Sequence, residues 1–531
     1  MTPSVMARLI VLLPLLAGQV AHGNPPPVPL TDLQTRGKQV YTVTSSPSGG
    51  EITAFLRISS VQAPGEAMPC VNCHGVDGLG RPEGDIVPGN ISWKELTKPY
   101  RVRLPGGRER PSYTEEAFAR AITEGVDPAG NKLAPSMPVY TMPREDLDAL
   151  IAYIKILGGE QEVGVTDGSI RLATVLPMRG RMSEAGKAME SMIKAYLTDV
   201  NGRGGVYSRR LELEILDYGE SGQSALAAVK GLVERHETFA LIAPFLAGAD
   251  EEIAELANAA GLPIVGPQTQ YPLAASQLNR SVFYLFPGLR EEGMVLLDFS
   301  AGAGPGKGRP IALVSPADSV AKAVVDAVLE AARQKGFRPL PPITYKPGAM
   351  EASRLSLDLK AAGAGVVLFH GSPDDLTALA EGSVAADWHP QVLLWGAPVN
   401  MSVFNAATLL DQGLFLAYPI LPSDQSPAGS REISRLMDAH GLPKGPFRAQ
   451  LSAFCACKIL TEGLKAAGRQ LTREGLILAL ERFYEFETGL TPKITYGPNR
   501  RIGALGAYIL KVDGGKKDLV PASGWIVPST P

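Results

Sequence analysis

The chain has 531 residues. At roughly 150 residues per domain, this length predicts about two to four domains, each large enough to bury a core. Hydrophobic residues make up 45 % and charged residues 20 %, which excludes a disordered or collagen-like protein. The 51 Lys and Arg residues are spread along the chain and are balanced by 54 acidic residues, for a net charge of -3. A nucleic-acid partner is therefore not expected.

The N-terminus has the pattern of an export signal. Arg8 precedes an apolar run at 9–17 that is too short to span a bilayer, and Ala21 and Gly23 form a small-residue cleavage site. We predict a cleavable signal peptide at 1–23 and a mature protein in the periplasm. The alternative is an uncleaved membrane anchor. No later apolar run reaches about 18 residues, so no transmembrane segment is expected after signal cleavage.

Beyond the signal, the sequence predicts two unlike halves. Residues 31–158 are expected to form a small helical domain, in which apolar residues at helical spacing predict helices at 115–123 and 144–157. Residues 160–169 are expected to form a linker. At 170–531, short apolar strands alternate with amphipathic helices, which indicates parallel α/β architecture.

The most specific motif is CVNCH, at residues 70–74. Two thiols three residues apart can add to the two vinyl groups of haem while the adjacent histidine binds the iron. The motif therefore predicts one covalent haem c held by Cys70 and Cys73, with His74 as the proximal iron ligand. A zinc site is not favoured, because the other Cys and His residues lie far away in the sequence. A thioredoxin-type redox centre is not favoured either, since a glycine-rich loop follows the motif.

The stretch 31–158 resembles the class I cytochromes c. The resemblance rests on GKQVY as a first helix, CHGVDGLG as a haem-binding loop, and NKLAPSMPVY followed by a last helix. It implies an all-α cytochrome c domain with one haem. One departure is an insert between Gly37 and Cys70 that contains EITAFLRI. We expect this insert to form a strand or hairpin that covers part of the haem.

The same resemblance implies a methionine as the second axial ligand of the iron. Met137 lies in Ser-Met-Pro ahead of the last helix, as the family's axial methionine does. Met142 precedes Pro143, at a position that the family usually gives to an apolar residue. We expect Met137 to bind the iron, with Met142 as the alternative. A thioether ligand suits electron transfer, and six-coordinate iron leaves no open position for catalysis.

The second half resembles the type I periplasmic binding proteins, above all the branched-chain amino-acid receptors of ABC transporters. The resemblance rests on the order and spacing of VNGRGGVYSRRLELEILDYGES, FALIAPFLAGADEEIAELANAAGLPIVGP and TPKITYGPNRRIGALGAYILKV. It implies a two-lobed α/β domain, and the apolar runs alone also predict two parallel sheets. The strands expected in the first sheet are 170–178, 211–218, 239–245, 263–265 and 282–286. Those expected in the second sheet are 310–314, 343–345, 365–369, 392–395 and 414–418.

A ligand of such sheets lies beyond the carboxyl ends of the strands, here between the two lobes. The candidate cleft residues are Met178, Arg179, Phe245, Leu246, Ala247, Gln268 and Thr269 from one lobe, and Ser315, Gly371, Ser372, Trp395 and Tyr418 from the other. The alternative for each of them is an ordinary loop position. The amino-acid receptors carry carboxylate-binding serines after their third strand, where this chain has PFLAG. We therefore expect a ligand that is less polar than an amino acid or differently charged, or no ligand.

The remaining cysteines, Cys455 and Cys457, lie in a strongly helical stretch. Residues two apart point to different faces of a helix, so a disulfide between them is not expected. We interpret both as small buried hydrophobic residues.

Two functions of different classes are compatible with these patterns. In the first, the chain is a non-enzymatic periplasmic electron carrier whose receptor half docks or senses a small molecule, with a dehydrogenase or an oxidase chain as redox partner. In the second, it is the solute receptor of a transporter and its haem is accessory. A third, weaker alternative is a haem enzyme such as a peroxidase, which would require an open sixth position on the iron.

Overall fold

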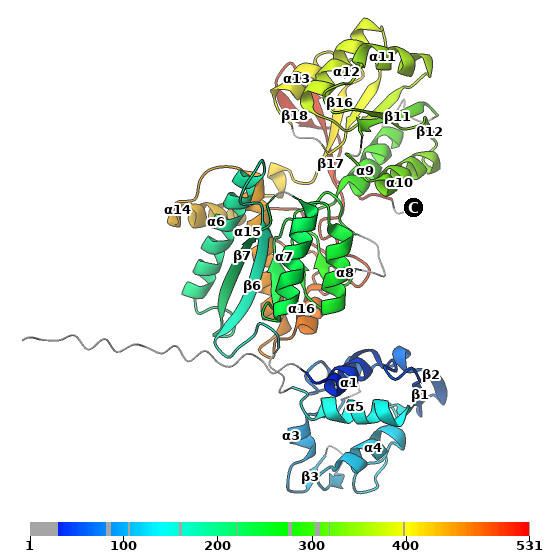
Figure 1. The fold of residues 1–531 in the computed structure, drawn as a ribbon, viewed down its shortest axis with the longest axis vertical. Helices are drawn as coiled ribbons and strands as arrows, with labels where there is room; N and C mark the ends of the chain where they lie inside the picture. Colours follow the sequence, from blue (N-terminus) through cyan, green and yellow to red (C-terminus); the bar gives the residue numbers. More distant parts are fainter. Residues whose placement is uncertain are drawn as a thin grey trace, which may run out of the picture.

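The computed structural model describes residues 30–80, 87–104, 107–158, 162–219, 221–273, 279–302, 308–317, 319–396 and 399–529. They form an N-terminal helical region, a first α/β lobe and a second α/β lobe (Figure 1). The predicted signal peptide at 1–23 lies outside the described residues. Among the helices that are described, not one is both long and apolar enough to cross a membrane.

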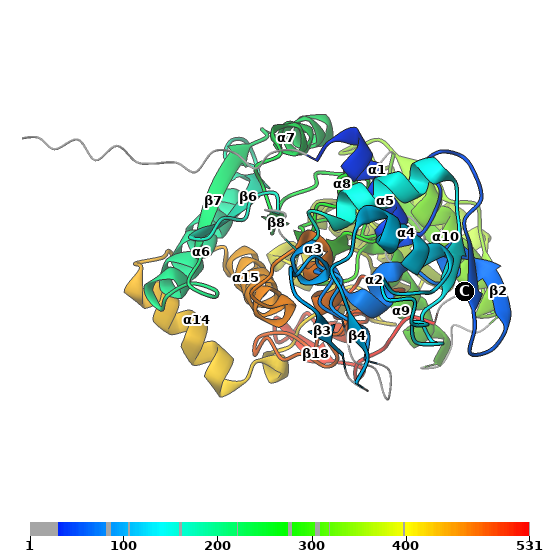
Figure 2. The same cartoon turned by 90° about the horizontal axis from the view of Figure 1, so that it is seen from below.

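The N-terminal region is built around two crossing helices, α1 and α5. A Cβ atom on Gly37 of α1 would lie 1.9 Å from the backbone oxygen of Ala149 on α5, so only glycine lets the two helices come this close (Figure 2). The helices of the region are α1 (Asp32–Val43), η1 (Gly65–Ala67), α2 (Cys70–His74), α3 (Trp93–Leu96), α4 (Glu115–Thr123) and α5 (Arg144–Ile154). The helix predicted at 115–123 is confirmed, and the one predicted at 144–157 ends three residues earlier as a regular helix.

The predicted hairpin in the insert is confirmed. Strands β1 (Thr53–Leu56) and β2 (Val61–Pro64) are antiparallel, and β1 also pairs with β5 (Val139–Thr141). A short ladder joins β3 (Val102–Arg103) and β4 (Glu109–Arg110). The region is therefore mainly helical but carries a small three-stranded sheet, because the insert supplies two strands beside the segment that follows Met137.

The first lobe contains a five-stranded parallel sheet, as predicted, and the order of its strands is β10-β9-β8-β6-β7. Its apolar strands are buried on both faces, with α6 and α15 on one side and α7 and α8 on the other. The strands are β6 (Ser169–Leu176), β7 (Arg210–Asp217), β8 (Ala240–Ile242), β9 (Ile264–Val265) and β10 (Val282–Phe283). The helices are α6 (Ser183–Gly202), α7 (Gly222–Arg235), α8 (Asp250–Ala260), α14 (Pro427–Ala439), α15 (Phe447–Ala467) and α16 (Arg473–Leu480).

The second lobe contains an eight-stranded mixed sheet, in which β13 pairs with β11 beside the path β12-β11-β14-β15-β16-β17-β18. The five strands predicted for this lobe are parallel, whereas β17 and β18 are antiparallel additions from the C-terminal segment. The strands are β11 (Pro310–Pro316), β12 (Arg338–Pro339), β13 (Ile343–Tyr345), β14 (Val366–Phe369), β15 (Gln391–Leu394), β16 (Leu414–Tyr418), β17 (Tyr508–Asp513) and β18 (Asp518–Pro521). The helices are α9 (Leu289–Gly302), α10 (Lys322–Gln334), α11 (Ala352–Ala361), α12 (Pro373–Ala385), α13 (Met401–Ala407) and η2 (Pro422–Asp424).

The chain passes between the lobes after β10, after β16 and before β17 (Figure 1). Helices α14, α15 and α16 therefore belong to the first lobe although they follow the second lobe in sequence, and α15 packs into the core of the first lobe. These connections bring the carboxyl ends of both sheets toward the junction between the lobes.

Candidate functional site

Helix α2 consists of the CVNCH motif itself. Pro69 precedes it in extended conformation, and Gly75 ends it with a φ of 77°. Residues three apart lie on the same side of a helix, so the thiols of Cys70 and Cys73 project from one side of α2. Both cysteines are free of disulfides. This is the arrangement that two thioether bonds to one haem require.

His74 is held in a single orientation. Its side chain is 7 % exposed, and its Nδ1 atom lies 3.0 Å from the backbone oxygen of Gly89. A carbonyl oxygen can only accept, so Nδ1 carries the proton and Nε2 presents its lone pair. Burial lowers the pKa of the imidazole, while the Gly89 oxygen acts in the opposite direction. A neutral imidazole fixed through its other nitrogen is the form that binds a metal.

Two buried tyrosines fix the segment around α2. The hydroxyl of Tyr41 on α1 donates to the backbone oxygen of Gly75 at 2.5 Å, and that of Tyr140 on β5 donates to the backbone oxygen of Met68 at 2.7 Å. Sequence analysis assigned no role to either tyrosine. The bond of Tyr41 joins residues 34 positions apart, and that of Tyr140 joins residues 72 positions apart. A hydrogen bond to a backbone oxygen leaves no pattern in the sequence.

Met137 and Met142 lie on either side of β5. Both side chains are partly buried against the hydrophobic core of the region. The backbone N–H of Met137 donates to the oxygen of Ala134 at 3.0 Å, which closes a turn in the loop, and Met142 directly precedes the N-cap of α5. The choice of Met137 over Met142 stays a prediction.

The residues of this region fit a haem. Two thiols, a neutral imidazole and a thioether form the donor set of a c-type cytochrome. Apolar side chains next to these donors are only partly buried against the core, namely those of Met68, Val71, Ile91 and Leu133. Such partly exposed apolar surface is what a porphyrin ring would cover.

In the first lobe, the predicted cleft residues lie at the carboxyl ends of β6, β8 and β9. Arg179 is exposed, but its Nε atom donates to Asp217 at 2.6 Å, so its charge is paired. Phe245 forms a parallel bridge with Gln268, and both are half-buried. Thr269 is half-buried as well, and its hydroxyl accepts from the N–H of Tyr271 at 2.9 Å.

The two other predicted positions of the first lobe, Met178 and Ala247, are half-buried and exposed respectively. The N–H of Met178 donates to Asp217, whereas Ala247 has a φ of 52° and lies in the turn after β8. Neither side chain carries a polar group. The first lobe therefore offers a ligand few side-chain donors at these positions.

Two predicted cleft residues lie in the core instead, and we correct their assignment. Trp395 is 0 % exposed, and its indole N–H donates to the backbone oxygen of Leu289 at 2.6 Å. Because this bond satisfies its polar group, the tryptophan can pack inward at the end of β15. Leu246 is also 0 % exposed and packs in the core of the first lobe. Ser315 is nearly as inaccessible, at 3 % exposed.

Two of the remaining second-lobe candidates, Gly371 and Ser372, lie at the start of α12. Ser372 is the N-cap of this helix, and its hydroxyl also donates to Asp375 at 2.8 Å. A Cβ atom on Gly371 would lie 2.4 Å from the hydroxyl oxygen of Tyr345, so a larger residue there would displace that tyrosine. Tyr418 is half-buried at the end of β16.

Two contacts between the lobes involve Tyr271 and Arg448, which the sequence analysis did not select. The hydroxyl of Tyr271, in the loop after β9, donates to the oxygen of Ser319 in the second lobe at 3.2 Å. The guanidinium of Arg448, at the start of α15, lies 5.6 Å from the ring centre of Tyr418. Within the second lobe, His370 directly follows β14, and its Nδ1 atom lies 2.8 Å from the backbone oxygen of Trp395. The rule that ligands lie beyond the carboxyl ends of parallel strands could have identified His370, but it could not have identified Tyr271 or Arg448.

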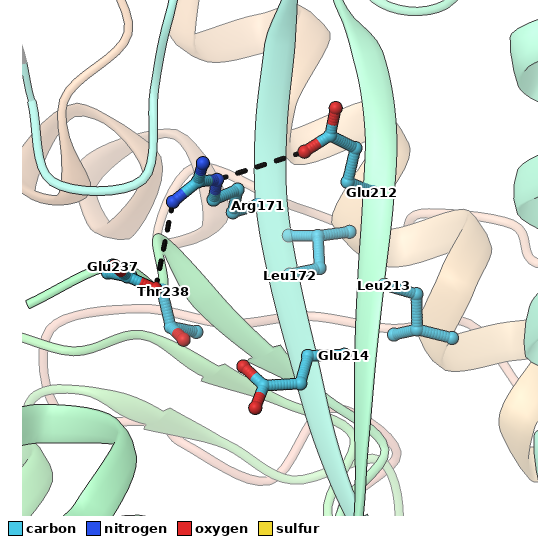
Figure 3. Close-up of a pocket in the computed structure, with 7 residues that line it drawn as sticks. All are labelled: Arg171, Leu172, Glu212, Leu213, Glu214, Glu237 and Thr238. Carbon is cyan, nitrogen blue, oxygen red and sulfur yellow. Dashed lines mark ion pairs between the residues drawn. The ribbon is translucent and has the colours of Figure 1, made fainter. Parts of the chain in front are cut away.

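A surface groove of about 350 Å³ lies at the opposite, amino-terminal end of the first lobe's strands (Figure 3). Arg171 on β6 lies 3.8 Å from Glu212 and 3.7 Å from Glu237, and these side chains are about half exposed. Glu214 pairs with Arg235 outside the groove at 2.6 Å. Long ion pairs between exposed groups are typical of a solvated surface, so we assign no ligand to this groove.

The interpretation of the other two cysteines is supported. Cys455 and Cys457 on α15 are both 0 % exposed. Burial raises the pKa of the Cys455 thiol to about 12, and it raises that of Cys457 well above its ordinary value. Among the residues that the structure describes, no group of three or more His, Cys, Asp and Glu side chains could hold a metal ion.

Comparison with known families accounts for both halves. The family model described as periplasmic binding protein matches residues 169–517, which is most of the chain. The chain belongs to the periplasmic binding protein family. The family model described as cytochrome c matches residues 66–158, so this periplasmic binding protein also carries a cytochrome c domain. No curated protein matches the chain.

Solved structures resemble the binding-protein domain. A branched-chain amino-acid ABC transporter protein from Thermus thermophilus with bound valine is 18 % identical, covers 68 % of this chain and 97 % of its own, and has a TM-score of 0.56. A fatty acid ABC transporter substrate-binding protein from Thermomonospora curvata is 18 % identical, covers 70 % and 95 %, and has a TM-score of 0.55. At these identities the likeness shows the fold alone. Members of the two matched families are typically periplasmic and non-enzymatic.

Proposed function

We propose that this periplasmic binding protein is a periplasmic electron carrier with one haem c. Cys70 and Cys73 attach the haem, and His74 and Met137 are its axial ligands. The observation that carries the proposal is helix α2, where the two thiols share one side and the Nδ1 atom of His74 is engaged by Gly89. The bound haem supplies one-electron oxidation and reduction.

The protein residues determine how such a group is used. The neutral imidazole of His74 offers Nε2 to the iron because its proton is held on Nδ1. A thioether from Met137 favours the reduced state and raises the reduction potential. His74 and Met137 together would leave the iron no open position for a substrate, so we propose a carrier and not an enzyme.

The binding-protein domain would supply recognition. Its two lobes and the positions at the carboxyl ends of their strands support a small-molecule ligand, and we propose a dehydrogenase or oxidase chain in the periplasm as redox partner. Export by the predicted signal at 1–23 is part of this proposal. A second candidate, a transport receptor with an accessory haem, is favoured by the size of the matched binding-protein domain, residues 169–517.

Haem attachment and ligation are tested on protein produced in a host with a haem-attachment system. The haem should remain with the polypeptide after denaturation and acid-acetone extraction, because two thioether bonds hold it. Met137→Ala should abolish the sulfur-to-iron charge-transfer band of the oxidised protein and lower its potential, whereas Met142→Ala should leave both nearly unchanged. Extractable haem would refute the covalent site, and the reverse result for the two variants would assign the ligand role to Met142.

Measurements of electron transfer and of ligand affinity separate the two candidate functions once a retained small molecule has been identified from the purified protein. A carrier transfers electrons to a periplasmic redox partner whether or not that molecule is present. A transport receptor with an accessory haem would keep its ligand affinity after Cys70 and Cys73 are both replaced by Ala. Electron transfer from the native protein to such a partner, with or without the small molecule, would support the carrier. No such transfer by the native protein, together with unchanged ligand affinity in the double variant, would support the receptor.

A further inference from the structure

We propose that Arg57, in the insert hairpin, is a positioning residue that holds the methionine loop in place and so keeps Met137 on the iron. The methionine loop is the segment 131–138. This inference rests on the proposed role of Met137 as axial ligand. The insert is a departure from the class I cytochromes c that this region resembles. The proposal gives this insert a specific role.

The guanidinium group of Arg57 binds carbonyl groups of the methionine loop. The Nη2 atom of Arg57 donates to the backbone oxygens of Leu133 at 3.2 Å and Ala134 at 3.0 Å. The oxygen of Ala134 also accepts from the N–H of Met137 at 3.0 Å. One guanidinium group therefore binds the same carbonyl that closes the turn carrying Met137.

The hairpin places this guanidinium accurately. Arg57 follows β1 directly, and β1 pairs with β5, which begins two residues after Met137. The next residue, Ile58, donates its N–H to the oxygen of Pro135 at 3.2 Å. The loop is thus bound to the hairpin both before and after Met137, with the carbonyls of 133, 134 and 135 all engaged by residues 57 and 58.

The surroundings favour an arginine at this position. A Cβ atom on Gly125 would lie 3.0 Å from the guanidinium carbon of Arg57, so glycine leaves room for the side chain. The Nε atom of Arg57 is buried and has no hydrogen-bond partner among the described residues. A buried donor without a partner is unfavourable, so the bonds to the loop carbonyls have to compensate for it. The planar guanidinium is preorganised for several acceptors at once, which lysine is not.

A methionine ligand leaves the iron only when its loop opens. The apparent affinity of the oxidised protein for an external ligand such as imidazole is therefore the intrinsic affinity multiplied by the fraction of open loop. Bonds that hold the loop closed reduce this fraction. Loss of the Arg57 bonds should therefore raise the affinity for imidazole.

The test compares Arg57→Gln, Arg57→Lys and the control Gln62→Ala, which changes an exposed residue of the same hairpin. We expect Arg57→Gln to bind imidazole about tenfold more tightly or more, and to weaken the sulfur-to-iron charge-transfer band. Arg57→Lys should recover part of the native behaviour, since it keeps a charged donor, and Gln62→Ala should match the native protein.

Native imidazole affinity and a native band in Arg57→Gln would overturn the proposal. Loss of haem attachment in both Arg57 variants, with Gln62→Ala unaffected, would overturn it too, because Arg57 would then be required for folding and not for positioning. Met137→Ala tests the proposed ligand set separately. If Met137 is not an iron ligand, this variant would leave the sulfur-to-iron charge-transfer band unchanged.

Discussion

Asp250 is a buried carboxyl group whose charge should lower the stability of the binding-protein domain at neutral pH. Its side chain lies at the start of α8, is 2 % exposed, and has no hydrogen bond to either carboxyl oxygen among the described residues. Burial raises the pKa of this carboxyl from 3.8 to about 7, and the nearby Thr269 hydroxyl only partly opposes the increase. The folded protein therefore retains a proton that the unfolded chain releases.

The sign and size of the effect follow from this difference in pKa. Below pH 3.8 both states hold the proton, and as the pH rises toward about 7 only the unfolded chain releases it, so stability falls. Above that pH the loss is complete, and at about 1.4 kcal/mol per pKa unit it is on the order of 4 kcal/mol. Asp250→Asn removes the charge but leaves a polar amide to be satisfied, so we expect a gain of about 2 kcal/mol at about pH 8 and much less at about pH 5.

Urea unfolding followed by tryptophan fluorescence at the two pH values measures this gain. Three of the four tryptophans, Trp388, Trp395 and Trp525, lie in the binding-protein domain. Glu251→Gln, a change at an exposed position of the same helix, is the matched control and should alter stability by less than about 0.5 kcal/mol at either pH. An equal effect of Asp250→Asn at both pH values, or a loss of stability at the higher one, would refute the reasoning.

Three further predictions concern the buried ion pair, the ligand and the coupling between the two domains. Arg501 and Glu481 form a 2.6 Å pair with side chains 3 % and 11 % exposed, so Arg501→Met should cost about 3–5 kcal/mol in urea unfolding, and adding Glu481→Met should restore much of it. If the double variant is no more stable than Arg501→Met, the unpaired charge is not the cause. Leucine, isoleucine and valine should not bind at micromolar concentrations in calorimetric titrations, because Ala247 offers no donor and Leu246 is buried. Tight binding would show that Thr269 and backbone amides suffice. A saturating ligand should move the haem midpoint potential by less than about 30 mV, or about 0.7 kcal/mol, because residues 30–158 and 162–529 share no hydrogen bond or ion pair among the described groups. A much larger shift in a potentiometric titration would indicate that the haem reports on the cleft.

The haem-attachment motif could be predicted from the sequence because its chemistry is local. Two thioether bonds and an adjacent ligand require Cys70, Cys73 and His74 at fixed spacing, whatever the rest of the chain does. The helix at 115–123 and the five parallel strands expected in each lobe were also predictable, since apolar periodicity and burial on both faces of a sheet leave direct patterns. Sequence alone thus determined the two-part architecture and the position of the haem-attachment motif.

Only the tertiary structure decided which side chains face the cleft and which hold the haem region together. Trp395 directly follows a strand, as a ligand residue would, yet it packs inward because the oxygen of Leu289, distant in sequence, accepts its indole N–H. Arg57 reaches Leu133 and Ala134 only because β1 pairs with β5. The free energy of a contact between residues so far apart in sequence depends on how the intervening chain folds. Such a contact therefore cannot be predicted from the local spacing of residues.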